Sequence, residues 1–316
     1  MELLARLTER CRLGALEPLE VHFARLMERL DGRGDPALVL GAVLTSHLTA
    51  SGHVCADLRE LAGRLVLEAE GAEPLLAPDL PHWIARLRDS PVVGAAGEFK
   101  PLVLDPVGRL YLHRYWDYER QLAQGLRARA RERDGVDEAR LKADLTTLFA
   151  QPAFDWQRVA AATAVLQRLV VISGGPGTGK TTTVTRILAL LLSQDPQLRI
   201  QLAAPTGKAA GRMQEAIRQA KDRLPLAPGL RTAIPEQAAT LHRLLGWRPG
   251  AAGLRHGPDN PLALDVLVVD EASMVDLALM TRLLGALPPG ARLILLGDKD
   301  QLASVEAGAV LADICG

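Results

Sequence analysis

The segment that most constrains the fold is a glycine-rich stretch that fits the pattern G-x-x-x-x-G-K-[ST]. It comprises Gly174, Gly175, Pro176, Gly177, Thr178, Gly179, Lys180 and Thr181. It follows the apolar run 169–173 and precedes a helical pattern over 180–192. In this context backbone N–H groups curl around phosphate oxygens and the helix N-terminus adds its positive dipole end. The pattern therefore predicts a strand–loop–helix unit that binds a nucleotide, rather than a glycine-rich turn with an accidental Lys-Thr.

From residue 153 onward, apolar strands alternate with helices. The expected strands are 169–173, 200–204, 263–270 and 291–297. The expected helices are 156–168, 180–192, 207–220, a short one near Thr240, 276–287 and 307–314. Strands that are apolar throughout and separated by helices indicate an α/β fold, with a parallel sheet covered on both faces.

The preceding part of the chain has a different pattern of apolar and charged residues. Residues 1 to about 95 show the apolar spacing of short amphipathic helices, and 101–112 predict a β-hairpin. Charged helices over 115–133 and 137–148 follow, and Pro152 marks the expected boundary. We therefore expect a mainly helical domain with a terminal β-hairpin, a helical linker and an α/β domain with a small insertion at about 247–260. Their predicted ranges are 1–112, 113–152 and 153–316.

Composition excludes several classes of protein. The 316 residues hold 37 basic and 37 acidic side chains, which argues against a polycationic tail protein or an acidic disordered protein. No apolar run approaches about 18 residues, and the N-terminus lacks the features of a signal peptide. Three scattered cysteines without metal or redox spacing fit a reduced, cytosolic protein. Residues 1–150 have three more acidic than basic side chains, and 151–316 the reverse.

The second half of a nucleotide site is expected at the end of another buried strand. Asp270 and Glu271 directly follow the apolar run 266–269. Lys180 is expected to reach the β- and γ-phosphates of ATP or GTP, and Thr181 and Asp270 to hold Mg²⁺. Glu271 is placed to orient and deprotonate the attacking water. Thr182 completes the predicted set of nucleotide-binding residues.

Two other clusters permit competing interpretations. His47, His53 and Cys55 lie close together, but without a fourth ligand at a sensible spacing we favour ordinary histidines over a metal site. The arginines of the run 127–133 could bind nucleic acid, although a solvated helix face is the favoured interpretation.

Five segments resemble motifs of superfamily 1 DNA helicases. In chain order they are SGGPGTGKTTT, LAAPTGKAA, TLHRLLG, LVVDEASM and LGDKDQLASVEAGAVLADI. Together they resemble the RecD family, the alpha subunits of exodeoxyribonuclease V (RecBCD). The resemblance is dense over about 155–316 and looser over 1–150, where the family has a helical domain that packs on RecC. It implies a RecA-like P-loop motor domain over 153–316.

The resemblance also implies roles outside the phosphate loop. Gln157 lies 17 residues before Gly174, where the superfamily has its adenine-reading glutamine, and Gln301 is placed to contact the γ-phosphate. The candidate DNA contacts are Pro205, Thr206, Lys208, Thr240 and His242. Contacts from such residues to phosphates carry no sequence information. Trp247 and Arg255 of the insertion are candidate contacts at the point of strand separation, but a structural hairpin is an equal alternative.

The implied function is that of an ATP-dependent 5′→3′ DNA helicase subunit. By this resemblance it acts on single- and double-stranded DNA ends in double-strand break repair and homologous recombination, in a heterotrimer with RecB-like and RecC-like subunits. No segment resembles motifs IV to VI, so the second RecA-like domain with its arginine finger is expected to be absent and turnover by residues 1–316 alone weak.

Three alternatives stay open. They are a stand-alone RecD-like helicase, a non-motor P-loop assembly subunit and an ATPase that remodels proteins. Stand-alone relatives carry helix-hairpin-helix repeats with paired glycines before the motor. Residues 1–150 show no such repeat, which favours the complex subunit.

Overall fold

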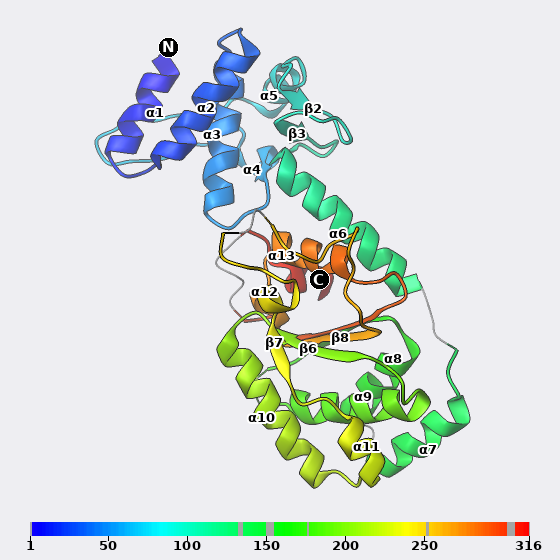
Figure 1. The fold of residues 1–316 in the computed structure, drawn as a ribbon. Coiled ribbons are helices and arrows are strands. Elements are labelled where there is room, and N and C mark those ends of the chain that lie inside the picture. Colours follow the sequence, from blue (N-terminus) through cyan, green and yellow to red (C-terminus); the bar gives the residue numbers. More distant parts are fainter. Residues whose placement is uncertain are drawn as a thin grey trace. The chain divides into compact units, whose positions relative to one another are not determined.

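The computed structural model describes residues 2–131, 135–149, 155–175, 177–250, 253–301 and 307–315. The chain forms two compact units (Figure 1). The first comprises Met1–Arg120 with Val305–Gly308, and the second comprises Gln121–Ser304 with Ala309–Gly316. The division falls within the long helix α6 (His113–Arg131).

The first unit packs helices on a small sheet. Its helices are α1 (Glu2–Arg12), α2 (Pro18–Asp31), α3 (Pro36–Ala50), α4 (Leu58–Leu61) and α5 (Leu80–Arg88). Its strands are β1 (Ala56–Asp57), β2 (Val93–Gly94), β3 (Leu102–Leu104) and β4 (Arg109–Leu112), in the order β1-β4-β3-β2. The predicted hairpin is confirmed as β3 and β4, whose turn is held by Asp105 accepting hydrogen bonds from the N–H groups of Val107 and Arg109. The short strands β1 and β2 were not predicted.

The continuously apolar helix α3 forms the centre of this unit. Its residues from Ala37 to Thr45 are all buried, as a helix without a polar face requires. Asp35 caps its first turn by accepting from Ala37 N–H, and Trp83 donates to the Ala37 carbonyl at 2.9 Å. His47 pairs with Glu20 at 3.2 Å, and the described residues contain no cluster of three or more metal-binding side chains.

The second unit is an α/β sandwich. Its helices besides α6 are α7 (Glu138–Leu148), α8 (Trp156–Leu166), α9 (Lys180–Gln194), α10 (Gly207–Arg223), α11 (Pro228–Ala233), α12 (Leu241–Leu244), the 3₁₀ turn η1 (Ala272–Met274), α13 (Leu277–Ala286) and α14 (Val310–Cys315). Its strands are β5 (Leu169–Ser173), β6 (Ile200–Ala204), β7 (Ala238–Thr240), β8 (Val266–Val269) and β9 (Arg292–Gly297). Figure 1 shows α8, α9 and α10 on one side of the sheet and α13 on the other.

The five strands are all parallel, in the order β5-β9-β8-β6-β7. This confirms the predicted fold class. Strands β8 and β9 are buried along their whole length, whereas β5 at the edge is largely half-buried. Because all strands run the same way, the loops that follow them lie at one edge of the sheet, where open α/β sheets bind ligands.

Helix α6 corrects the interpretation of the arginine run at one position, Arg129. Arg129 is buried and donates to the carbonyl oxygens of Leu287 and Pro288, at 3.2 and 3.0 Å. It therefore satisfies carbonyl groups after α13 and is neither part of a nucleic-acid patch nor of a solvated face. Arg127 and Arg131 are exposed, and Arg133 lies outside the described residues.

The insertion also differs from expectation. Among its described residues, 247–250 and 253–256 form no strand pair, and a single bridge joins Gly257 to Asn260. Gly246 adopts a left-handed conformation that directs the chain away from α12, and a side chain there would lie 2.6 Å from Cβ of Arg255.

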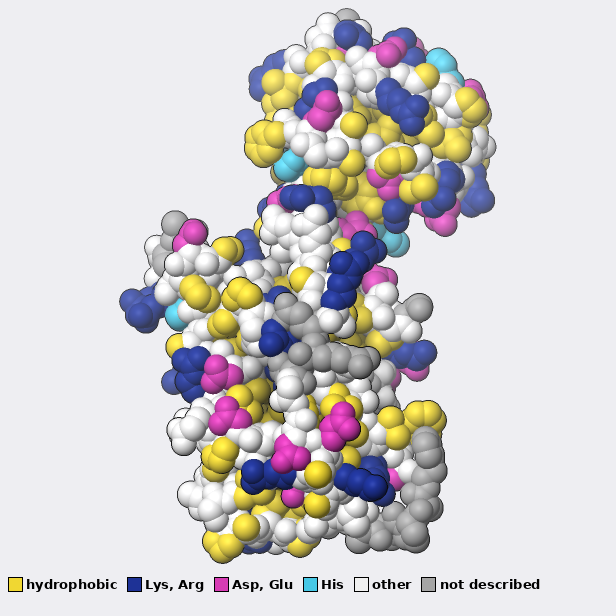
Figure 2. Space-filling view, turned by 90° about the vertical axis from the view of Figure 1, so that its right-hand side faces the viewer, with side chains coloured by type: hydrophobic (Ala, Val, Ile, Leu, Met, Phe, Trp, Pro, Cys, Tyr) yellow, Lys and Arg dark blue, Asp and Glu magenta, His cyan; other side chains and the backbone are white. Residues whose placement is uncertain are grey.

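The surface agrees with the balanced charge. On the face drawn in Figure 2, basic and acidic side chains are interspersed and neither sign gathers into a continuous patch. No described helix is long and apolar enough to cross a membrane.

Candidate nucleotide-binding site

The phosphate loop joins β5 to α9 as predicted. Gly177 and Gly179 have φ values of 79° and 80°, which L side chains rarely adopt, so the glycines are required by the path of the loop. Gly179 is the N-cap of α9, and Lys180 begins the helix. Pro176 lies outside the described residues.

Two side chains fold back onto the loop. Lys180 Nζ donates to the carbonyl oxygens of Gly174 and Gly175, the latter at 3.0 Å. Thr178 Oγ1 donates to the same Gly175 oxygen at 2.9 Å. These contacts keep the ammonium group inside the curve of the loop, and Thr181 lies beside it in the first turn of α9. Thr182 follows in the same turn.

Asp270 directly follows β8, and its N–H donates to the Ala203 carbonyl of β6 at 2.9 Å. Burial raises the pKa of Asp270, and the negative charge of Glu271 acts in the same direction, whereas the positive charge of Lys180 lowers the pKa. The carboxyl group accepts one hydrogen bond, from Glu271 N–H at 2.9 Å, so it keeps lone pairs for a further partner. Lys180 of α9 is thus near enough for its charge to act on Asp270, which follows β8.

Glu271 has an unusual backbone. Its φ and ψ are 51° and 40°, the left-handed region, which costs a residue other than glycine about 1–2 kcal/mol. Strained residues of this kind cluster at functional sites. The strained turn directs the chain from β8 into η1, with Glu271 as its N-cap residue.

The loop after β9 lies beside the phosphate loop. Gly174 N–H donates to Gly297 O, and Lys299 N–H donates to Ser173 Oγ, both at 3.1 Å. In the described part of this loop, Gln301 Oε1 accepts from Ser273 Oγ of η1 at 3.4 Å. Gln301 is therefore held next to the turn that begins with Glu271.

Gly297 allows this close approach. A side chain there would lie 2.4 Å from Leu311 Cδ2 and 3.2 Å from the backbone nitrogen of Ser273. A larger residue would force Leu311 to move and would crowd the backbone of Ser273, so glycine suits the narrow space between η1 and α14.

Gln157 lies beside the phosphate loop and contacts it. It lies in the first turn of α8, which Asp155 caps by accepting from Gln157 N–H at 2.8 Å. Its Nε2 donates to the carbonyl oxygen of Thr178 at 3.0 Å, and its Oε1 accepts from Arg186 at 3.0 Å. A cleft of about 450 Å³ lies here, lined by Gln157, Thr178, Lys180 and other residues of α8, β5 and α9.

Sequence reasoning did not find Arg186. The available signal was a basic residue in the otherwise uncharged interior of α9, between Thr185 and Ile187. Such a residue is usually a surface position, and only the fold shows that this one faces Gln157.

The predicted DNA contacts lie on two neighbouring loops. Strands β6 and β7 pair with Ala204 opposite Thr240, so Pro205 and Thr240 leave the same edge of the sheet. Thr206 and Thr240 cap α10 and α12 by accepting backbone hydrogen bonds at 3.2 Å, which leaves each hydroxyl hydrogen available to donate.

The two remaining candidates on this rim are exposed. They are Lys208 and His242. All five predicted contacts thus lie together, next to the loops that carry the acidic pair.

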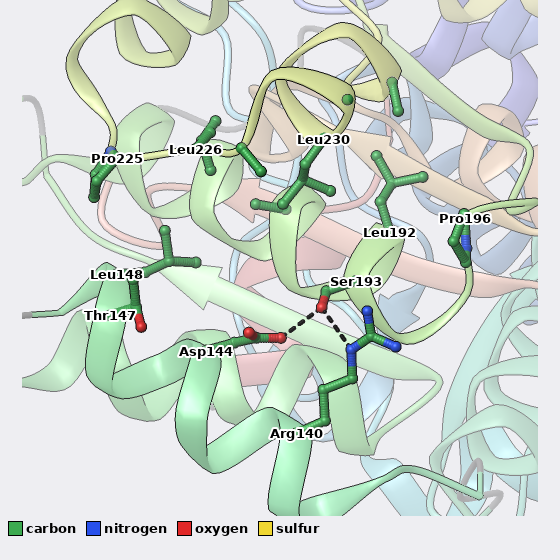
Figure 3. A pocket seen from close by; sticks show the side chains of 14 residues that line it. Arg140, Asp144, Thr147, Leu148, Leu192, Ser193, Pro196, Pro225, Leu226 and Leu230 are labelled. Carbon is green, nitrogen blue, oxygen red and sulfur yellow. Dashed lines mark hydrogen bonds between the residues drawn. The ribbon is translucent and has the colours of Figure 1, made fainter.

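A larger cavity, of about 610 Å³, lies elsewhere in the unit (Figure 3). It is lined by α7, the last turns of α9 and the segment around Leu226 and Leu230. Since α9 has 15 residues, its two ends are about 22 Å apart, so this cavity is remote from Lys180. Its polar groups bind one another, because Ser193 donates to Asp144 at 2.6 Å and accepts from Arg140 at 3.0 Å.

Two domain families match the chain. The family described as "RecBCD enzyme subunit RecD, N-terminal domain" matches residues 12–111, and the family described as "AAA domain" matches residues 157–307. The second range begins at Gln157 and includes the phosphate loop, Asp270, Glu271 and Gln301.

Curated relatives give the same result. The chain is 46% identical over 307 residues to "RecBCD enzyme subunit RecD" of Mycolicibacterium smegmatis, covering 95% of the chain and 52% of that protein. The protein of the same name from Mycobacterium tuberculosis is 44% identical over 308 residues, covering 95% of the chain and 51% of that protein. The "ATP-dependent RecD2 DNA helicase" of Deinococcus radiodurans is 45% identical over 144 residues, 46% of the chain and 17% of that protein.

The chain spans about half the length of the curated RecD proteins that it matches along 95% of its own length. The order of its two domain matches, the RecD N-terminal domain and then a P-loop domain, agrees with the two units of the fold. The chain belongs to the RecD family and corresponds to the N-terminal part of its members.

Proposed function

We propose that the chain is the ATP-dependent 5′→3′ DNA helicase subunit of a RecBCD-like (exodeoxyribonuclease V) enzyme. It works with RecB-like and RecC-like subunits on DNA ends, in double-strand break repair and homologous recombination. One observation carries the proposal. The loops that carry Lys180, Asp270 and Gln301 leave the same edge of one sheet as the rim that carries Thr206 and His242.

The residues at this edge fit ATP and Mg²⁺. Thr181 offers a hydroxyl and Asp270 a carboxylate with spare lone pairs, the oxygen ligands that Mg²⁺ takes alongside nucleotide phosphates. When bound, Mg²⁺ neutralises charge on the β- and γ-phosphates. Lys180 binds the same phosphates, and Glu271 accepts a proton from the attacking water.

The same geometry suggests how ATP turnover is passed to DNA. Gln301 of the loop after β9 contacts Ser273 of η1, in the turn that follows Glu271. A change at the γ-phosphate therefore reaches the loop after β9 and the turn after β8. From β8, the hydrogen bond between Asp270 N–H and Ala203 leads to β6 and so to Pro205 and the DNA rim. Contacts from this rim to phosphates suit a motor that moves along any sequence.

The first unit has a surface suited to a protein partner. Leu19, Leu26 and Leu30 of α2 are exposed, Leu19 by 75%. Their spacing of 7 and 4 residues places them on one face of the helix. An exposed apolar stripe of this kind marks a protein-interaction site, and we assign it to the RecC-like subunit. A cytoplasmic location follows from the proposed work on DNA.

A lysine variant tests the motor role. Lys180→Gln is expected to reduce ATP hydrolysis by residues 1–316 at least tenfold and to abolish ATP-dependent unwinding of 5′-ended substrates by the assembled complex. Residues 1–316 alone are expected to turn over slowly even without the substitution, because no segment resembles motifs IV to VI. Unwinding that persists in the complex would assign the chain to a non-motor assembly role.

A stand-alone RecD-like helicase is the second candidate. It is favoured by the 45% identity to the Deinococcus radiodurans helicase over 144 residues. The match of residues 12–111 to the RecD N-terminal domain supports the complex subunit instead. Co-purification of the chain with RecB-like and RecC-like proteins separates the two, since a stand-alone enzyme would purify as an active monomer.

A further inference from the structure

Both polar atoms of the Gln157 amide are engaged. Nε2 donates to the carbonyl oxygen of Thr178, and Oε1 accepts from Nη1 of Arg186, each at 3.0 Å. A guanidinium group can only donate and a carbonyl oxygen can only accept. These two neighbours therefore determine which way the amide faces, and the reversed orientation would place like groups against each other.

We propose that Arg186 is a positioning residue that gives the site its preference for adenine by fixing the orientation of Gln157. This inference rests on the proposed ATP-binding function. In the observed orientation, Oε1 keeps a second lone pair and Nε2 a second hydrogen. Adenine presents an amino donor at N6 and an acceptor at N7, whereas guanine presents acceptors at both O6 and N7. The fixed amide matches adenine at both atoms and opposes guanine at one.

The surroundings of Arg186 favour a specific role over ordinary packing. Its guanidinium lies 4.5 Å from the ring centre of Phe149, a buried residue, and its Nε is buried without a hydrogen-bond partner. Burial also lowers the pKa of Arg186. Arg186 as a whole is half-buried, and a partly buried cation with an unsatisfied Nε is costly, whereas an apolar residue would fill the same space without that cost. Within the described parts of the chain, Gln157 is the hydrogen-bond partner that accounts for an arginine here.

The amide is also in close contact with the phosphate loop. A side chain on Gly179 would lie 2.6 Å from Nε2 of Gln157, and the φ of Gly179 is 80°. The amide thus rests directly on the turn that begins α9. Recognition of the base by Gln157 is therefore coupled to binding of the phosphates, and Arg186, on the same helix as Lys180, connects the two.

The test compares ATP and GTP binding by residues 1–316, measured by competition with a fluorescent ADP analogue. Arg186→Met keeps a long side chain over Phe149 but removes the donors. We expect it to weaken ATP binding about tenfold and GTP binding by less than about twofold, since a bidentate amide contact discriminates by about that factor. Gln157→Ala is expected to lose the same preference, and the double variant to lose no more than Gln157→Ala alone.

Inorganic tripolyphosphate is the control ligand, because it has no base. Its binding is expected to be unchanged by Arg186→Met. Equal weakening of ATP, GTP and tripolyphosphate would show a merely structural role and overturn the inference. A wild-type site without preference for ATP, or a double variant with additive losses, would overturn it as well.

A second variant covers the case in which Arg186→Met does not fold. Phe149→Leu removes the ring beneath the guanidinium and is expected to give a smaller loss of the same ATP preference. An unchanged preference in that variant would count against the inference. If Lys180→Gln leaves ATP binding intact, the proposed nucleotide site is wrong and this inference with it. If Lys180→Gln abolishes binding while Arg186→Met keeps the preference, this inference alone is overturned.

Discussion

Lys221 of α10 donates hydrogen bonds to Oε1 of Glu236 at 2.7 Å and to the carbonyl oxygen of Ile234 at 3.0 Å. The ammonium group is buried, whereas the carboxylate is half-exposed and also lies 3.5 Å from Arg218. These contacts fix the chain two residues before β7, and β7 ends at Thr240. A buried lysine on α10 therefore determines where one of the predicted DNA-contact loops begins.

The Lys221–Glu236 pair makes stability depend on pH. The hydrogen bond from Lys221 is the main cause that lowers the pKa of Glu236 below its ordinary 4.5. A carboxylate whose pKa is lowered by folding stabilises the protein above its unfolded pKa, and this contribution is lost as the pH falls through the folded value. We expect Glu236→Gln to reduce the free energy of unfolding by about 1–2 kcal/mol at pH 7.

The effect of Glu236→Gln is measured by urea unfolding at pH 7 and near pH 4, where the difference from the unsubstituted protein is expected to shrink. Glu215→Gln is the matched control, because Glu215 is exposed and pairs with Arg218 at 3.2 Å on the surface of the same helix. Its expected change is below about 0.5 kcal/mol. A loss for Glu236→Gln that does not vary with pH would contradict this explanation.

Two substitutions at Glu271 are expected to distinguish the catalytic role of its carboxylate from the strain of its left-handed backbone. Glu271→Gln should reduce ATP turnover by a factor of at least about 10² while ATP binding persists, because the amide cannot accept the proton from water. Glu271→Gly should be equally inactive. It should also melt about 2 °C higher, since glycine adopts the left-handed conformation without the cost that Glu271 bears. Thermal unfolding of both variants makes the comparison, and equal melting temperatures would show that the turn is unstrained.

Asp270 is expected to lower the stability of the nucleotide-free protein. Burial raises the pKa of its carboxyl group, so folding favours the protonated form. For a raised carboxyl pKa, stability is greatest at low pH and declines as the pH rises through the folded value. Asp270→Asn should therefore raise the melting temperature at pH 7, abolish Mg²⁺-dependent ATP hydrolysis, and lose its stability advantage as the pH is lowered. A melting temperature at pH 7 below that of the parent protein would contradict this.

Two helix glycines are expected to respond to alanine with opposite signs. A side chain on Gly125 of α6 would lie 2.4 Å from Cδ2 and 3.1 Å from Cγ of Leu284, which is itself buried. Gly125→Ala should therefore cost about 1 kcal/mol or more through overpacking. Gly211 of α10 has no atom within 4 Å of the added position, so Gly211→Ala should stabilise by about 0.5–1 kcal/mol. Chemical denaturation of both variants measures the sign of the change in the free energy of unfolding for each.

The long elements of the second unit could be predicted from sequence because each is defined by its own residues. The runs 169–173 and 200–204 coincide with β5 and β6, since an apolar run bounded by polar and glycine residues has few other places to pack. The short strands β1, β2 and β7 could not be predicted. A strand of two or three residues is defined by the neighbour that it pairs with, such as Ala204 opposite Thr240, and that neighbour is remote in sequence.

Only part of the site could be predicted from the sequence, for a similar reason. The phosphate loop and the Asp270–Glu271 pair follow from local patterns, and the structure places them at one sheet edge. The contact between Arg186 and Gln157 joins residues 29 positions apart, and the burial of Arg129 depends on carbonyl groups more than 150 residues away. A local pattern in one sequence does not indicate contacts between residues that are so far apart in the chain.

The position of β5 at the edge of the sheet has a consequence for how the protein opens. Strands β8 and β9, which lead to Asp270 and Gln301, are wholly buried and each pairs on both sides, whereas β5 pairs with β9 and is largely half-buried. Amide hydrogen exchange should therefore be fastest in β5 and slowest in the two inner strands. ATP bound by the loop after β5 is expected to slow hydrogen exchange in β5 more than in the other strands. The bound nucleotide would therefore make the edge strand as resistant to opening as the inner strands.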